Sequence, residues 1–346
     1  MRAYPERANL AVPGVYYPTQ PFAMNVLLTG ANGFLGSHIA RQLIDRGYTV
    51  RALLRPNSPT PTLHDLPIVP VAGDLRDRAS VIRAADDCQY IIHAGALASV
   101  NPARNQTVWD INLAGTENVL RAAHLTGVER LVYVGTANVF GFGTKTNPGN
   151  ENSPYVGTRY GLDYMDSKEA ATRRVMQSGV PAVGVHPTFM LGSMDHKPTS
   201  GALLLGLYKR QVAGTPVGGK NYVHVADVAT ATVNALTKGR VGEQYILGNQ
   251  NLSYAEAFAL MAEVMECRPP SVTIPKGVAW VAGQLSQLQA TITRKPARLN
   301  PAMVAVANDG HYFDVQKAVR ELELPQTPVQ EAIRDAFDWF RANGYV

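Results

Sequence analysis

Asn25-Val26-Leu27-Leu28-Thr29-Gly30-Ala31-Asn32-Gly33-Phe34-Leu35-Gly36 is the stretch that decides the fold. Its first five residues form an apolar run without polar alternation, which is typical of a parallel strand buried on both faces. The spacing G-x-x-G-x-x-G follows, and a helical pattern then runs from Phe34 to Arg46. A glycine turn between a buried strand and a helix lets the backbone approach a pyrophosphate closely, and the helix N-terminus stabilises its charge. The stretch therefore predicts a dinucleotide-binding turn.

The same alternation of strand and helix continues along the chain. Strands are expected at 48–54, 67–72, 90–93, 130–135 and 182–185, and helices at 78–85, 108–125 and 163–179. Alternation over more than ~150 residues requires crossover connections, which are right-handed and build a parallel sheet with helices on both faces. The expected fold class is α/β, with a doubly wound parallel sheet.

After Pro187 the rhythm loosens, and glycines and prolines interrupt the chain before another strand and helix at 222–236. Helical periods return at 254–265, 277–288 and 327–342. We therefore expect a dinucleotide-binding domain and a smaller, mainly helical C-terminal substrate domain. The expected division is an extension at 1–23, the dinucleotide-binding domain at 24–187 with a returning segment near 220–248, and the substrate domain at 188–219 and 249–346.

Composition excludes several classes of protein. Of 346 residues, 46% are hydrophobic and 17% charged, which is unlike a disordered, collagen-like or coiled-coil chain. The formal charge is +5, but basic residues do not cluster beyond pairs, so we expect no nucleic-acid partner. No secretory signal or apolar run of membrane-spanning length is visible, which predicts a cytoplasmic protein without an integral membrane segment. The two cysteines and eight histidines show no metal-ligand spacing, and no metal site is predicted.

The end of the second expected strand bears on nucleotide choice. An acidic residue there would accept hydrogen bonds from a free ribose 2′-hydroxyl, but Leu54 and Arg55 occupy this place. A guanidinium suits a 2′-phosphate instead, so NADP(H) is predicted over NAD(H), which stays possible. Asp74, after the third strand, could contact the adenine or cap the following helix.

Three side chains suggest proton transfer. Tyr164 and Lys168 are four residues apart in a helical stretch and so share one helix face. Thr136 follows the fifth strand, and strand C-termini are where a doubly wound sheet gathers its ligand. We expect the Lys168 ammonium to lower the pKa of the Tyr164 phenol toward neutrality, so that the phenol can donate a proton to a developing alkoxide while the threonine hydroxyl holds the carbonyl oxygen.

These features together resemble the extended branch of the short-chain dehydrogenase/reductase superfamily, commonly labelled NAD-dependent epimerase/dehydratase. The resemblance covers roughly residues 25–247. It rests on Thr29 to Gly36, Gly73-Asp74-Leu75, His93-Ala94-Gly95-Ala96, Ile111 to Thr116, Tyr133 to Gly141, Tyr164 with Lys168, and Tyr222 to Val228. It implies a Rossmann-type sheet. Val50 to Arg55 and Ser153 to Lys168 look most like dihydroflavonol-reductase-like carbonyl reductases.

The resemblance also implies roles for individual residues. The implied catalytic residues are Thr136, Tyr164, Lys168 and Asn112, the last as support for a water relay. The implied cofactor-binding residues are Gly30, Asn32, Gly33, Phe34, Leu35, Gly36, Arg55, Asp74, Leu75, Ala94, Gly95, Ala96, Tyr164, Lys168, and His186 with Pro187, which stand where the family often has Arg-Pro. Substrate contacts are expected from Thr136, Phe142, Tyr155 and Tyr160.

The expected function is NADPH-dependent reduction of a ketone or aldehyde of a small organic substrate. A nucleotide-sugar epimerase or dehydratase with tightly bound NAD(P) is the enzymatic alternative, because it uses the same three side chains. A non-catalytic nucleotide sensor of the same fold is a further alternative, although such proteins commonly lack the tyrosine. Family resemblance also implies a homodimer formed through the helices at 108–125 and 163–179.

Overall fold

The computed structural model describes residues 24–293 and 300–346, and the extension expected at 1–23 lies outside them. Within the described residues, seven strands form a sheet of order β3-β2-β1-β4-β5-β6-β9 in which each neighbouring pair is parallel. The strands are β1 (Asn25–Thr29), β2 (Thr49–Leu54), β3 (Val69–Ala72), β4 (Tyr90–His93), β5 (Arg130–Val134), β6 (Ala182–Pro187) and β9 (Gln244–Leu247). This order confirms the doubly wound, Rossmann-type sheet. Its direction of winding reverses between β1 and β4, where such sheets bind ligands.

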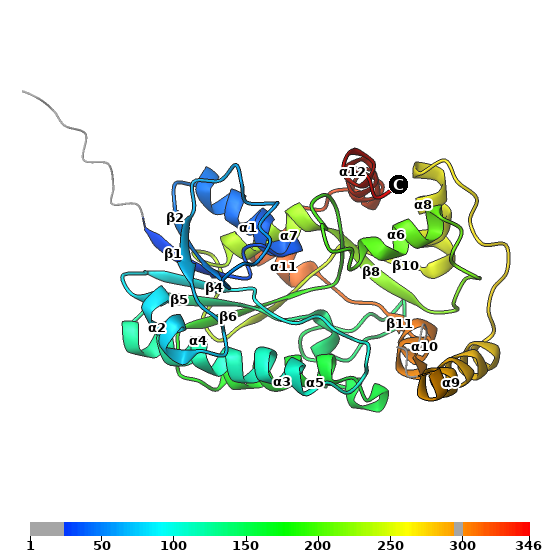
Figure 1. Ribbon diagram of the computed structural model, residues 1–346, viewed down its shortest axis with the longest axis horizontal. Coiled ribbons are helices and arrows are strands. Elements are labelled where there is room, and N and C mark those ends of the chain that lie inside the picture. The colour runs from blue at the N-terminus through cyan, green and yellow to red at the C-terminus, as the bar shows by residue number, and fades with distance from the viewer. Residues whose placement is uncertain (1–23, 294–299) are drawn as a thin grey trace, which may run out of the picture.

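Helices cover both faces of this sheet (Figure 1). One face carries α1 (Phe34–Asp45), α7 (Val225–Asn234) and α11 (Gln316–Glu321). The opposite face carries α2 (Arg78–Ala85), α4 (Gly115–Thr126) and α5 (Asp163–Met176). Each face has its own apolar core, because strands such as β4 are buried along their whole length.

The helix expected at 108–125 departs from regular geometry. It consists of α3 (Gln106–Trp109), a π-helical segment at Asp110–Ala114 and α4, and Asn112 lies within the π segment. A π segment widens one turn of a helix and is frequent at functional sites. The sequence pattern did not indicate it.

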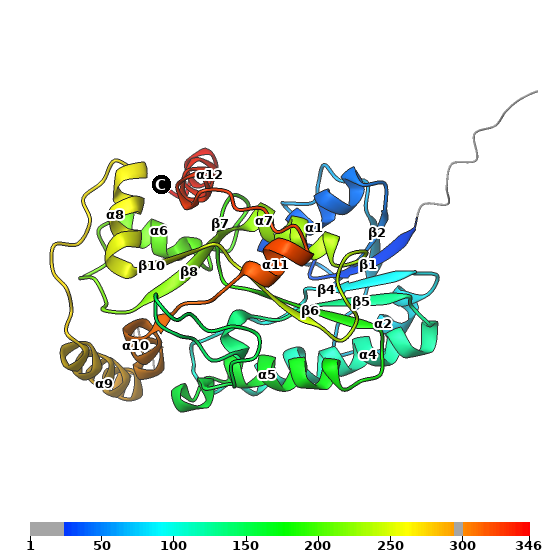
Figure 2. The same ribbon diagram turned by 180° about the vertical axis from the view of Figure 1, so that it is seen from behind.

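A second, smaller sheet forms the other half of the molecule. It contains β8 (Gly219–His224), which pairs with β7 (Phe189–Leu191), β10 (Gln250–Ser253) and β11 (Gly310–His311). Around it lie α6 (Gly201–Tyr208), α8 (Tyr254–Val264), α9 (Lys276–Thr293), α10 (Pro301–Asn308) and α12 (Val329–Ala342), as Figure 2 shows. Only Thr188 separates β6 of the main sheet from β7 of the small one. The chain therefore brings the two sheets together directly after Pro187.

The expected division into domains stays a prediction, but the strands can be assigned to sheets. In the segment near 220–248, α7 and β9 pack on the main sheet, whereas β8 pairs only within the small sheet. The small sheet was not expected in a part of the chain whose patterns are mainly helical. Its strands are two to six residues long and come from four separate segments, so no local alternation indicates them.

Candidate active site at the carboxyl ends of the main sheet

The glycine turn after β1 is packed too tightly for side chains. Gly30 has a φ of +73°, and a Cβ placed on it would lie 2.7 Å from the Gly95 Cα. A Cβ on Gly36 would lie 1.9 Å from the Gly30 carbonyl oxygen. Gly33 precedes the first residue of α1, and the N–H groups of Phe34 and Leu35 belong to the first turn, where no intrahelical acceptor exists. The turn therefore exposes backbone donors at a helix N-terminus, as a pyrophosphate requires.

This turn opens on a cavity of about 200 Å³ at the ends of β1, β2, β3 and β4. Its lining includes most of the predicted cofactor residues, namely Gly30, Asn32, Gly33, Arg55, Asp74, Leu75, Ala94, Gly95 and Ala96. The lining adds Ser58 and Leu53, which the sequence motifs did not single out. Strand ends that are far apart in sequence thus meet at one cavity.

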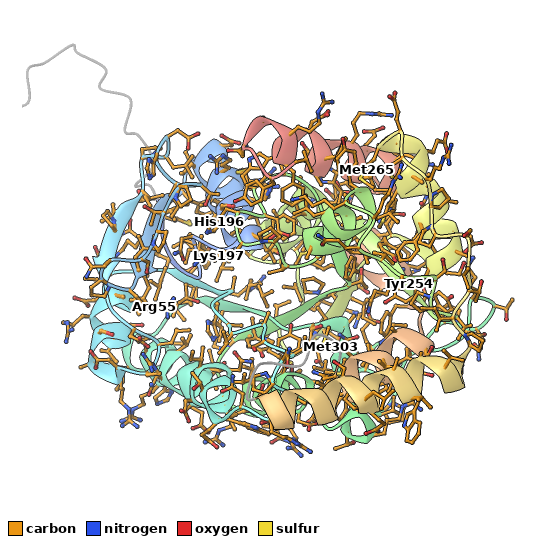
Figure 3. All side chains as sticks on the ribbon, turned by 45° about the vertical axis from the view of Figure 1, so that its right-hand side comes forward. Arg55, His196, Lys197, Tyr254, Met265 and Met303 are labelled. Carbon is orange, nitrogen blue, oxygen red and sulfur yellow. The ribbon has the colours of Figure 1, made fainter. Side chains whose placement is uncertain are left out.

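One basic and one acidic side chain, Arg55 and Asp74, line this cavity. Arg55 is exposed and lies at the edge of the main sheet, far from Tyr254 and Met265 of the small-sheet half (Figure 3). Asp74 is held by two hydrogen bonds from the Arg76 guanidinium, at 2.8 and 3.0 Å, and these bonds lower the pKa of its carboxyl. Asp77, not Asp74, caps α2. Arg76 was missed in the sequence because an arginine in a surface loop has no distinguishing pattern.

A second group of predicted residues meets beside β5. Thr136 follows β5, while Tyr164 and Lys168 come from successive turns of α5. The Thr136 side chain lies close enough to the Tyr164 phenol to lower the pKa of the phenol. The Lys168 ammonium donates a hydrogen bond of 2.7 Å to the Val134 carbonyl oxygen and lies 4.5 Å from the centre of the Tyr133 ring. The structure thus brings together the three side chains predicted for proton transfer.

Burial controls the ionisation of this group. Burial raises the pKa of Tyr164, and the neighbouring Thr136 side chain opposes that rise only in part. Burial also lowers the pKa of Lys168 to about 7. The expectation that Lys168 brings the Tyr164 pKa toward neutrality therefore does not describe this structure, because the ammonium is directed to the Val134 carbonyl.

Asn112 clamps the loop that follows β4. Its side-chain oxygen accepts a 2.8 Å hydrogen bond from the Leu97 N–H, and its amide donates to the Leu97 carbonyl and to the Ser167 hydroxyl, both at 3.2 Å. Ser167 directly precedes Lys168. These contacts make Asn112 a positioning residue, and its support of a water relay stays a prediction.

A buried chain of hydrogen bonds connects this clamp to the glycine turn. The Gly95 N–H donates to the Thr29 hydroxyl oxygen at 3.0 Å, and that hydroxyl lies 2.7 Å from His93 Nδ1. His93 Nε2 lies 3.0 Å from the Thr116 hydroxyl, which donates to the Asn112 carbonyl at 2.5 Å. Burial lowers the pKa of His93 to about 3, so the ring is neutral. The chain joins the cofactor turn to the π segment.

The remaining predicted residues lie less directly at the site. His186 is fully buried against Gly135 and 4.8 Å from the centre of the Phe140 ring, so its side chain is not presented to a ligand, whereas Pro187 lines a pocket. The Tyr155 hydroxyl donates to Asp166 at 2.7 Å. The roles expected of these residues stay predictions.

Phe142 and Tyr160 stack with a histidine from the other half of the molecule. The Phe142 ring centre lies 4.2 Å from that of His311 and 6.5 Å from that of Tyr160. The Tyr160 hydroxyl donates to Asp309 at 2.6 Å. His311 itself lines a second pocket with Thr136. His311 carried no signal in the sequence, because its partners are more than a hundred residues away.

The described residues contain no group of three or more metal-ligating side chains. None of the described helices has the length and apolar character needed to cross a membrane.

Comparison with known proteins agrees with this geometry. The model of the NAD dependent epimerase/dehydratase family matches residues 26–248. The chain is 32% identical to a putative dihydroflavonol 4-reductase of Synechocystis over 92% of this chain and 95% of that protein. It is 28% identical to sterol demethylase protein B of Methylococcus capsulatus over 93% of this chain and 100% of that protein. A solved nucleoside-diphosphate-sugar epimerase of Pseudomonas aeruginosa superposes with a TM-score of 0.77 at 26% identity, covering 93% of this chain and 99% of that one. The chain therefore belongs to the NAD dependent epimerase/dehydratase family and is an NAD(P)-dependent enzyme of the extended short-chain dehydrogenase/reductase type.

Proposed function

We propose that the protein is an NADPH-dependent reductase that converts a ketone or aldehyde of a small organic substrate to the alcohol. The observation that carries this proposal is the meeting of Thr136, Tyr164 and the buried Lys168 at the carboxyl end of β5, at the same sheet edge as the dinucleotide cavity. The similarity to a protein named as a dihydroflavonol 4-reductase supports reduction.

Each side chain of this group has a separate task. When bound, the dinucleotide supplies the hydride that adds to the carbonyl carbon. Thr136 orients the carbonyl oxygen by a hydrogen bond, and Tyr164 donates its proton to the developing alkoxide. Because burial raises the pKa of Tyr164, the phenol is protonated at neutral pH and able to serve as the acid. Lys168 is held by the Val134 carbonyl, where its ammonium would bind the ribose of the dinucleotide and help a proton return to the Tyr164 phenolate after turnover.

Tyr164→Phe tests the proposed acid. The variant keeps the buried ring and removes the proton donor, so we expect kcat for NADPH-dependent carbonyl reduction to fall by about 10²–10⁴-fold. Affinity for NADPH, measured by fluorescence titration, should stay within a few-fold of wild type. Full turnover of a confirmed substrate by this variant would refute the mechanism.

Preference for NADPH is proposed to depend on Arg55. This guanidinium lines the cavity at the end of β2, and the carboxylate that lines the same cavity, Asp74, is hydrogen-bonded by Arg76. A charge-assisted hydrogen bond contributes about 1.5–3 kcal/mol, so Arg55→Ala should weaken NADPH binding about 10- to 100-fold and change NADH binding little. Arg268→Ala, at an exposed position after α8, is the matched control. Equal affinity of the wild type for the two nucleotides would contradict the proposal.

The similarity to a nucleoside-diphosphate-sugar epimerase makes epimerisation the second candidate. An epimerase keeps its dinucleotide bound through the catalytic cycle, whereas a reductase exchanges it. Mass spectrometry of the purified, denatured protein distinguishes the two. A free site supports the reductase, and stoichiometric NAD released on denaturation would favour the epimerase and a screen of nucleotide sugars.

A further inference from the structure

A small pocket lies where the two sheets meet, next to the proposed catalytic threonine. Its volume is about 50 Å³, and it is lined from the main sheet by Thr136 and Asn138 and from the small sheet by Lys220 and His311. None of the ten lining residues is acidic. The pocket therefore offers positive charge and hydrogen-bond donors directly beside the position proposed for the reacting carbonyl.

Lys220 is the unusual member of this lining. Its ammonium makes no hydrogen bond and no ion pair within the described residues, and it lies 5.5 Å from the centre of the Phe189 ring. The other lysines withdrawn from solvent at the sheet edge have oxygen partners. Lys168 donates to Val134, and Lys317 donates to Glu243 and to the Gln244 carbonyl. Burial lowers the pKa of Lys220 to about 8, which still leaves the ammonium largely protonated at pH 7.

The neighbouring polar groups cannot neutralise this charge. His311 Nδ1 lies 3.1 Å from the Asn138 side-chain oxygen, and burial together with the Lys220 charge keeps the His311 pKa well below its usual value. Both ends of the Asn221 side chain are already used, by Thr188, Asn249 and Asn251. Because Asn138 uses its oxygen on His311, its amide remains available as a second donor.

Lys220 is half-buried, lines the pocket and has no acidic partner among the described residues, so an anionic ligand there would gain a charge-assisted hydrogen bond. We propose that Lys220 binds an anionic group of the substrate, a carboxylate or a phosphate, in the pocket that it shares with Thr136. The proposal rests on the proposed function for the identity of the reacting end. It adds that the substrate carries a negative charge close to its carbonyl, and that Lys220 determines this specificity.

Calorimetric titration of benzoate and of inorganic phosphate into the NADP⁺-saturated protein tests the site without turnover. We expect one of the two anions to bind wild type at least tenfold more tightly than Lys220→Met, with Lys220→Arg restoring most of the affinity. Tighter binding of benzoate assigns a carboxylate, and tighter binding of phosphate assigns a phosphate. Lys209→Met, at an exposed position at the end of α6, is the charge-matched control and should bind as wild type does.

Binding that is equal in wild type and Lys220→Met, or absent from both, would overturn the proposal. A second assay compares reduction of 4-carboxybenzaldehyde with reduction of its methyl ester. Lys220→Met should raise KM for the carboxylate at least tenfold, with kcat within threefold and KM for the ester unchanged, and equal losses on both would overturn the proposed specificity. Anion binding that depends on Lys220 without reduction of any carbonyl would instead refute the reductase function and leave the anion site standing.

Discussion

Lys168, a member of the proposed catalytic group, lies where burial disfavours its protonated form. Its side chain is 3% exposed and has a single hydrogen-bond acceptor, the Val134 carbonyl. Burial lowers its pKa from 10.5 to about 7 in the folded protein. Between these two pH values the Lys168 side chain is protonated in the unfolded chain and mostly deprotonated in the folded chain. The free energy of unfolding therefore rises with pH in that window.

This linkage gives a prediction for Lys168→Met. Wild type should gain stability between pH 7 and 10 with a contribution from Lys168 of about 1.4 kcal/mol per pH unit, and the variant should lack that contribution. Urea unfolding at pH 7, 8 and 9 measures the difference. Lys209→Met, which removes an exposed lysine, should keep the wild-type slope. Parallel pH dependence of wild type and Lys168→Met would show that the ammonium is not desolvated.

At the scale of the element, the turn from β1 into α1 depends on the absence of side chains. The Gly36 Cα faces the Gly30 carbonyl oxygen, so α1 starts against the strand end without an intervening methyl group. This contact and a series of hydrogen bonds hold the cofactor turn and the π segment together. The hydrogen bonds run from Thr29 through His93 and Thr116 to Asn112. Two elements that carry different functions are thus held in one arrangement.

Gly36→Ala tests this packing. The added Cβ would lie 1.9 Å from a backbone oxygen, so the turn must shift, at a cost of about 1–3 kcal/mol in the free energy of unfolding and at least tenfold in NADPH affinity. Gly277→Ala is the control, because a Cβ placed on Gly277 would have no atom within 4 Å and alanine favours the helix α9. Thermal unfolding and fluorescence titration measure both quantities. Unchanged NADPH binding by Gly36→Ala would contradict the role of this turn.

At the scale of the whole molecule, α4 and α5 lie side by side on the outer face of the main sheet (Figure 1). A salt bridge of 3.2 Å from Arg174 to Glu117 joins them, and Leu125 is 52% exposed at the end of α4. We propose that this helix pair packs against its copy in a second chain to form a homodimer, as the family resemblance implies.

Size-exclusion chromatography with light scattering tests the homodimer. The expected mass is about twice the 37.4 kDa of one chain, and Leu125→Lys should shift the equilibrium toward the monomer because it adds charge to the proposed interface. A mass of one chain at every protein concentration tested would contradict the proposal.

The sequence by itself determined most of the main sheet and the spacing of the proposed catalytic group. Buried strands and helices carry periodic apolar patterns that are local, so the six strands β1 to β6 and the helices between them were predicted with bounds within a few residues of those observed, whereas β9 was not predicted. The glycine spacing after β1 and the spacing of Tyr164 and Lys168 are local too, because a turn and a helix face are formed by neighbours in the chain. Their meeting with Thr136 followed from the rule that parallel strands end at one edge.

Only the tertiary structure decided the second pocket and the internal connections of the site. Lys220 and His311 reach Thr136 because β8 and β11 pair in a small sheet whose short strands come from distant segments. The hydrogen bonds of His93 join residues 64 and 23 positions away, and no local pattern encodes them. The pKa values of Tyr164 and Lys168 likewise depend on burial by the whole fold. Desolvation is a property of the packed molecule, which is why spacing alone led to the wrong direction for the tyrosine.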